Sequence, residues 1–379
     1  MRTLRNAALG ACACLLAGGP PAGAEVLAIM TYESMPGAAN RREGIAVMEL
    51  DRASPRFGHI LEDIPLPADL VGHHVYVNPA ADRAYITGLG RPELRVMTIR
   101  TREVKVVPVP DCQVGENVAF SLRTGNWYLT CMGSSVIVVG DMASDRPLRT
   151  IRLQAPYPHG IAIHDGIDRI LATSTVRPSD LQDPGEVVQE IRLSDGQPLG
   201  THRLSNRPSP SGSAPVEVMF VPGSDPPRAY ATGLYEGTLW YGEWRPAGQS
   251  FAWRQVVDFG AMGQELPLEI YFDARGTRAY VSTAKPGHLN TYDITDPASP
   301  RLLHTVPTAG GAHHMAFSPD GRFAFVQNSF LNLPGLHDGS ITVVDLERGV
   351  AVGSIDTLKR EGLTPNNITL LAGGAHGGH

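Results

Sequence analysis

Short stretches in which apolar and polar residues alternate recur along the chain, separated by turns rich in glycine, proline, aspartate and asparagine. Period-two alternation with many β-branched and aromatic residues predicts β-strands. The clearest unit has four such stretches: LEIYFDA (268–274), RAYVSTA (278–284), HLNTYDIT (288–295) and RLLHTVPT (301–308). The next unit repeats them as HMAFSP, RFAFVQN, SITVVDLE and GVAVGSID, and its Asp-Gly pair at 320–321 predicts a tight turn between the first two strands.

The first strand of this unit has seven copies, 43 to 57 residues apart, whose first apolar residues are Val75, Val118, Ile161, Val218, Ile270, Met315 and Ile368. A period of this length with strand-like copies is typical of a β-propeller. The last copy offers a single strand, whereas residues 26–65 offer three strands without a first. Joining them completes a blade and closes the ring. We therefore predict an all-β fold, a seven-bladed β-propeller with four-stranded blades, over residues 25–372.

The two ends of the chain are expected to lie outside this propeller. Residues 1–24 carry two arginines, a short apolar run and a small-residue site at Ala22-Gly23-Ala24, which indicates a signal peptide cut after Ala24. The apolar run before Cys12 is too short for a good lipoprotein signal. No later run nears the ~20 apolar residues of a membrane span. We expect an exported, periplasmic protein whose residues 373–379 form a disordered tail.

Charge and cysteine content narrow the picture further. The net charge is −6 with no basic block, so nucleic acid is not an expected partner. Export leaves Cys112 and Cys131 in an oxidising compartment. Cys112 precedes the first strand of the second copy and Cys131 ends its second strand, so both lie at one rim of the blade and we predict a disulfide. Their spacing is not that of a haem or zinc motif.

Histidines gather where the first strands begin. In a propeller these strands line the central channel, so the two residues before each aligned apolar position form two rings at one rim. One ring holds His74, Asn117, Gly160, Glu217, Glu269, His314 and Asn367, and the other holds His73, Glu116, His159, Val216, Leu268, His313 and Asn366. Five of the 13 histidines occupy these 14 positions, where an even spread would put about 0.5. Polar channel mouths often bind only water, but paired histidines from separate blades favour a metal site.

The residue types indicate which metal. Neutral imidazoles are good ligands for copper, zinc or iron, whereas calcium prefers oxygen ligands. We expect copper, in one or more ions, to be bound by His73, His74, His159, His313 and His314, with zinc or calcium less favoured. Glu217 and Glu269 would ligate the metal or accept protons from it, and the sequence leaves these two roles open.

The loops between second and third strands face the same rim. Two are long, one within 328–339 that carries His337 and one within 31–44. A third, shorter loop carries Lys285. Long loops on a rigid frame often carry function. We expect Lys285 and His337 to position an anionic substrate; the alternative for Lys285 is a solvated surface side chain.

The copies "RAYVSTAKPGHLNTYDITDP" and "AHHMAFSPDGRFAFVQNS" resemble the exported YVTN-type seven-bladed propellers over nearly all of the chain. Within that superfamily, the His-His strand starts look like those of the copper propellers: the catalytic domain of nitrous oxide reductase, thiocyanate dehydrogenase, and the selenium-binding or methanethiol oxidase group. The resemblance implies copper ligands from the inner ends of several blades. The cluster of nitrous oxide reductase is essentially all histidine, unlike a ring with Glu217 and Glu269. Thiocyanate dehydrogenase, which mixes histidine with carboxylates and a lysine, is more similar.

Three functions follow as hypotheses. The first is a periplasmic copper oxidoreductase that acts on a small sulfur or nitrogen compound and passes electrons to an external carrier. The second is a non-enzymatic exported propeller that serves as a metal-binding or protein-interaction scaffold. The third, a lactonase-like hydrolase with one calcium or zinc ion, would favour carboxylates over paired histidines.

Overall fold

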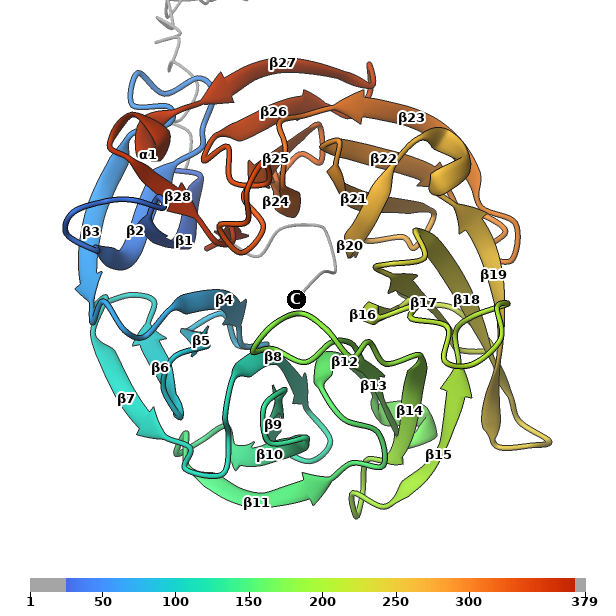
Figure 1. Ribbon diagram of the computed structural model, residues 1–379. Helices are drawn as coiled ribbons and strands as arrows, with labels where there is room; N and C mark the ends of the chain where they lie inside the picture. The colour runs from blue at the N-terminus through green and yellow to red at the C-terminus, as the bar shows by residue number, and fades with distance from the viewer. Residues whose placement is uncertain (1–24, 372–379) are drawn as a thin grey trace, which may run out of the picture.

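Seven antiparallel four-stranded sheets stand in a ring around a central channel (Figure 1). The computed structural model describes residues 25–371. The predicted all-β propeller of seven blades is confirmed. The predicted signal peptide, 1–24, and the predicted tail, 373–379, lie outside the described residues. Within 25–371, no helix is long and apolar enough to cross a membrane.

Six blades are continuous in sequence, and each runs from an inner strand at the channel to an outer strand at the rim of the disc. The inner strands are β4 (Gly72–Val77), β8 (Gly115–Ser121), β12 (Pro158–His164), β16 (Pro215–Phe220), β20 (Glu265–Phe272) and β24 (Ala312–Phe317). The second strands are β5 (Arg83–Gly88), β9 (Asn126–Cys131), β13 (Arg169–Ser174), β17 (Arg228–Gly233), β21 (Arg278–Lys285) and β25 (Phe323–Asn328). The third strands are β6 (Glu93–Thr98), β10 (Val136–Asp141), β14 (Val187–Arg192), β18 (Thr238–Arg245), β22 (His288–Asp293) and β26 (Ile341–Asp345). The outer strands are β7 (Val104–Pro108), β11 (Pro147–Arg152), β15 (Pro198–Arg203), β19 (Ser250–Asp258), β23 (Arg301–Pro307) and β27 (Val350–Ile355).

The seventh blade joins the two ends of the described chain, as predicted. Its three N-terminal strands are β1 (Leu27–Ser34), β2 (Glu43–Glu49) and β3 (Ile60–Leu66). Its inner strand follows the short helix α1 (Thr357–Arg360) and is split into β28 (Leu363–Pro365) and β29 (Thr369–Leu370), both paired with β1. The sequence predicted one unbroken strand here. The strand is interrupted because the register along β1 shifts across residues 366–368.

The hydrophobic core lies between neighbouring sheets. Between the blades of β4–β7 and β8–β11, for example, Tyr85 and Trp127 are fully buried. Burial of such a ring is worth roughly 2–3 kcal/mol. Gly140 of β10 is required beside Trp127, because a Cβ there would overlap the indole ring. The blades are thus held rigidly, which fixes where each inner strand begins.

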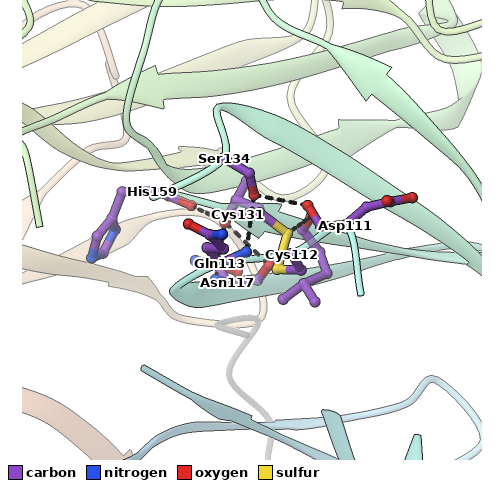
Figure 2. Close-up of a disulfide and its surroundings, with 9 residues drawn as sticks. Asp111, Cys112, Gln113, Asn117, Cys131, Ser134 and His159 are labelled. Carbon is purple, nitrogen blue, oxygen red and sulfur yellow. Dashed lines mark hydrogen bonds between the residues drawn. A yellow bond between two sulfur atoms is a disulfide. The ribbon is translucent and has the colours of Figure 1, made fainter. Parts of the chain in front are cut away.

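The predicted disulfide between Cys112 and Cys131 is confirmed, with an S–S distance of 2.00 Å (Figure 2). Cys131 ends β9 and pairs across the sheet with Gly115, the first residue of β8. The disulfide therefore holds the start of β8, which carries Glu116 and Asn117, at the channel mouth.

Candidate metal centre

A β-bulge sits near the start of every continuous inner strand. The register with the second strand shifts between Gly72 and Val75 in β4, and at the corresponding residues of β8, β12, β16, β20 and β24. Side chains along a regular strand point alternately to opposite faces, and a bulge redirects one of them. The bulge explains how consecutive residues such as His73 and His74 can both lie in the same cluster.

The chain turns sharply at the start of each of these strands. In five of the six blades the residue before the strand has a positive φ, including the β-branched Val71 (φ 52°) and Val114 (φ 57°); in the sixth it is Leu266 (φ 58°), the second residue of β20. This conformation costs a bulky residue about 1–3 kcal/mol. Hydrogen bonds to the carbonyl of this residue help to hold the turn. The carbonyl of Val71 accepts the N–H of Leu89 at 3.0 Å, and that of Val114 accepts the N–H of Met132 at 2.9 Å.

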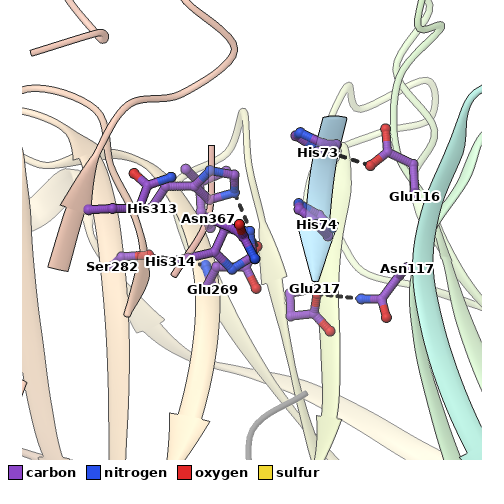
Figure 3. Close-up of polar contacts among 12 residues, drawn as sticks. His73, His74, Glu116, Asn117, Glu217, Glu269, Ser282, His313, His314 and Asn367 are labelled. Atoms are coloured by element: carbon purple, nitrogen blue, oxygen red, sulfur yellow. Dashed lines mark hydrogen bonds and ion pairs between the residues drawn. The ribbon is translucent and has the colours of Figure 1, made fainter. Parts of the chain in front are cut away.

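Four buried residues from three blades form the tightest cluster (Figure 3). Each of His74, Glu269, His313 and His314 offers a ligand atom, and these atoms lie within 4.8 Å of one another. One oxygen of Glu269 lies 3.2 Å from Nε2 of His313 and 3.8 Å from Nε2 of His314. All four side chains are buried. The arrangement offers three imidazoles and one carboxylate to a single ion.

A second cluster shares His74 with the first. Its members are His73, His74 and Glu116, again with ligand atoms within 4.8 Å. One oxygen of Glu116 lies 3.3 Å from Nε2 of His73 and 3.5 Å from Nε2 of His159. Each carboxylate thus lies between two histidines, and His74 stands between the two groups. Glu116, which the sequence analysis placed only in the ring, is a full member of the centre.

Two tyrosines that were not predicted as site residues contact the histidines with their hydroxyl groups. The hydroxyl of Tyr76 lies 2.7 Å from Nδ1 of His74, and that of Tyr271 lies 3.1 Å from Nδ1 of His314. Residues that bind the second ring nitrogen fix the orientation of a metal-binding histidine. A signal was present in the sequence: Tyr76 and Tyr271 follow His74 and Glu269 by two positions and therefore face the channel one layer deeper.

Burial shapes the charge of the centre. Burial, then the nearby histidines, hold the pKa of His74 well below its usual value, and burial likewise lowers the pKa of His159. Burial alone raises the pKa of Glu116, but His73 and His159 outweigh it, so this pKa lies below its ordinary value. Neutral imidazoles beside a charged carboxylate are the protonation states that a metal site requires.

Several ring nitrogens lack a hydrogen-bond partner. Within residues 25–371, these include Nε2 of His74, Nδ1 of His159 and Nδ1 of His313, all of them buried. Unpartnered buried polar atoms are rare and call for an explanation such as an ion or a water molecule. The donor set therefore fits a transition-metal ion, with the imidazoles as its main ligands.

Comparisons with known proteins bear on the fold. No protein-family model matches this sequence, and no curated protein sequence matches it. The chain is similar in structure to a hypothetical selenium-binding protein from Sulfolobus tokodaii, with a TM-score of 0.76 and 15% identity over 92% of this chain and 94% of that one. It is also similar to hydrazine synthase of Kuenenia stuttgartiensis, with a TM-score of 0.58 and 13% identity over 79% of this chain and 95% of that one. At such identities the likeness shows the propeller fold alone, and the fold does not fix the chemistry.

The other residues expected at the site are not members of the two clusters. Glu217 accepts the amide of Asn117 at 3.3 Å and the N–H of Val218 at 3.0 Å. Lys285 is exposed and pairs with Glu265 at 3.0 Å. Nδ1 of His337 lies 2.5 Å from the carbonyl of Leu333, within its own loop. Substrate-positioning roles for Lys285 and His337 remain predictions.

A small cavity of about 100 Å³ lies directly over the histidines. Its polar lining includes His73, Glu116, His159 and His313, and most of the remaining lining is apolar. Neither Lys285 nor His337 is among its lining residues. The cavity has room for a molecule of only a few heavy atoms.

Two long loops close this cavity. Leu331 comes from the predicted loop between β25 and β26, whereas Leu181 comes from the loop 175–186 between β13 and β14, which the sequence analysis did not count as long. Both leucines also line two larger hollows, of about 560 and 460 Å³. His73 lines the first of these hollows and Glu116 the second, so the centre is reached from both.

Proposed function

We propose that the channel mouth is a copper centre and that the protein is an exported oxidoreductase acting on a small sulfur or nitrogen compound. The observation that carries the proposal is the buried cluster of His74, His313, His314 and Glu269, whose ligand atoms lie within 4.8 Å of one another. A ligand set rich in imidazole suits copper or zinc, not calcium. The resemblance to the copper propellers favours copper over zinc. The Cys112–Cys131 disulfide fits an oxidising compartment such as the periplasm.

In this proposal the residues at the channel mouth would have different roles in metal binding, proton transfer and substrate binding. Copper would supply the one-electron redox chemistry, and electrons would pass to an external carrier. The five histidines would hold the metal, and Glu116 and Glu269 would balance its charge and accept protons from the substrate. The cavity over His73 and His313 would receive the substrate and exclude bulk water. Lys285 and His337 would guide an anionic substrate to the channel mouth. Each would first have to break its present contact, that of Lys285 with Glu265 and that of His337 with the carbonyl of Leu333.

A metal-binding scaffold without catalysis is the second candidate. It is favoured by the small size of the cavity that Leu181 and Leu331 line beside the histidines, because a confined site suits storage of an ion as well as turnover. The two candidates agree on metal binding and differ in redox activity.

An assay for substrate oxidation distinguishes the oxidoreductase from the metal-binding scaffold. Protein exported to a copper-supplemented periplasm is assayed with a panel of small thiols, thiocyanate and hydroxylamine and a soluble electron acceptor. The oxidoreductase predicts acceptor reduction that is lost in His314→Gln and in zinc-loaded protein, and retained in His59→Gln, whose exposed histidine lies in the loop between β2 and β3. Stoichiometric copper without turnover of any substrate would favour the scaffold.

A further inference from the structure

A belt of hydroxyl groups lies just behind the ligand rings. Each second strand carries one residue opposite the bulge, and in six of the seven blades it is threonine or serine: Thr31, Thr87, Thr130, Thr173, Thr232 and Ser282. All six are buried. A buried hydroxyl must find hydrogen-bond partners, and these partners are the bulges themselves.

Five of the six hydroxyls bind a backbone N–H in the bulge of their own blade, whereas the hydroxyl of Thr31 donates to the side-chain oxygen of Asn367 at 3.1 Å. The hydroxyls of Thr87, Thr130, Thr173, Thr232 and Ser282 accept the N–H groups of His74, Asn117, Gly160, Glu217 and Glu269, at 2.8 to 3.2 Å. The bonded residue is the second of the two that the bulge turns toward the channel. The hydroxyl thereby replaces the sheet hydrogen bond that the bulge removes.

Four of the hydroxyls also reach the next blade. They donate to the carbonyl of the first bulge residue there: Thr31 to His73 at 2.7 Å, Thr130 to His159 at 2.6 Å, Thr173 to Val216 at 2.7 Å, and Thr232 to Leu268 at 2.8 Å. Two of these acceptors belong to histidines of the candidate centre. The backbone of each is therefore fixed across a blade boundary.

We propose that Thr31 and Thr130 are positioning residues, which set the places of His73 and His159 around Glu116 through these backbone bonds. The inference rests on the proposed metal centre. A metal site demands ligand positions accurate to about 0.5 Å, and a bulge has fewer ladder bonds than a regular strand to supply that accuracy. Groups that orient ligands typically change metal affinity 10- to 100-fold when they are removed.

The seventh position of the belt is the exception. Gln327 stands there, in the blade that carries His313 and His314, and its side-chain oxygen accepts the N–H of Ser329 at 2.8 Å instead. The histidines of that blade are contacted instead by two side chains from β20 of the neighbouring blade: Glu269 contacts His313, and Tyr271 contacts His314. Belt hydroxyls also bind the backbone of His74 and Glu269, but within their own blades. Thr31 and Thr130 act across blade boundaries on His73 and His159, so loss of either hydroxyl should disturb chiefly the half that contains these two histidines.

Valine is close to threonine in shape and removes only the hydroxyl bonds, so Thr31→Val and Thr130→Val test the proposal. Thr238→Val is the control, because Thr238 is also buried, lies on the third strand β18 and belongs to neither ring, and its hydroxyl accepts the indole N–H of Trp240 at 3.1 Å. We expect copper dissociation constants about 10-fold or more weaker in Thr31→Val and Thr130→Val. Thr130→Ser should restore the wild-type value, and Thr238→Val should match the wild type in copper affinity.

Equal loss of affinity in Thr238→Val, or no loss in the other two, would overturn the proposal. If the wild type binds no copper, the proposed function fails, and the positioning role is then decided on metal-free crystals. A displaced His159 in Thr130→Val with an unmoved ring in Thr238→Val would support it. An unmoved His159 in Thr130→Val would refute it.

Discussion

The phenol oxygen of Tyr76 lies 2.7 Å from Nδ1 of His74, the histidine shared by both clusters. The contact occupies one ring nitrogen and leaves the other, Nε2, buried and without a hydrogen-bond partner. Tyr271 makes the corresponding contact with His314. Two layers of the channel therefore cooperate: the upper layer offers ligands, and the lower layer sets their orientation.

Removal of the phenol should weaken metal binding without unfolding the protein. In Tyr76→Phe the ring of His74 loses its partner, and we expect copper affinity to fall about 10-fold. Tyr85→Phe is the control, because Tyr85 is equally buried but its hydroxyl bonds Asp145 between blades. Competition titration with a chelator measures both. Equal affinity losses in the two variants would argue against an orienting role for Tyr76.

The carboxylates should differ in importance. Glu269 lies among His74, His313 and His314, whereas Glu217 is bound by Asn117 and the N–H of Val218. Glu269→Gln removes a charged ligand, so we expect a loss of copper affinity of at least 10-fold; Glu217→Gln should retain the metal. Isothermal titration of both variants checks this difference, and the reverse order of affinities would move the centre toward Glu217.

Acid should destabilise the metal-free protein. The pKa values of His74 and His159 lie below the ordinary 6.5 because the rings are buried, so the unfolded chain binds protons that the folded chain does not. The free energy of unfolding therefore falls as the pH drops below about 6.5, and the lowered pKa of Glu116 adds to the fall below about 4.5. Urea unfolding at pH 7.5 and 5.5 measures the effect. His74→Gln should lose less stability than the wild type over this interval, and an equal loss would contradict the assignment.

The disulfide should stabilise the blade that supplies Glu116. Cys112 and Cys131 are 19 residues apart, and closing a loop of that size is worth about 3 kcal/mol in the chain-entropy model. Denaturant unfolding of Cys112→Ser/Cys131→Ser should show a loss of this order. Copper affinity should also fall, since the start of β8 is freed. Wild-type affinity in the double variant would show that the bulge holds Glu116 without the disulfide.

Much of the fold could be predicted because each blade repeats the same signals. Alternation marks the strands, the period marks the blades, and the unpaired strands near the two ends predict ring closure. The split of β28 and β29 escaped prediction because a one-residue shift in register depends on pairing with β1, which the sequence of residues 366–368 does not reveal.

The site was predictable only in outline. Paired histidines at the strand starts located the rim, because each blade offers the same two positions. The partners across the channel depend on side-chain reach and on the bulges, so the sequence alone did not reveal that Glu116 lies between His73 and His159. The threonines of the belt looked like ordinary strand residues, since Thr is common in β-sheets. Their role emerged only when bonds across blade boundaries were visible.

The most direct test of the account is the copper content, by mass spectrometry, of wild-type protein and of His74→Gln after loading and dialysis. His74 belongs to both clusters, so this single change should affect every ion that the centre holds. The account predicts at least one copper per wild-type chain and a large loss in His74→Gln with the fold preserved by circular dichroism. Copper that remains in the variant, or none in the wild type, would contradict it.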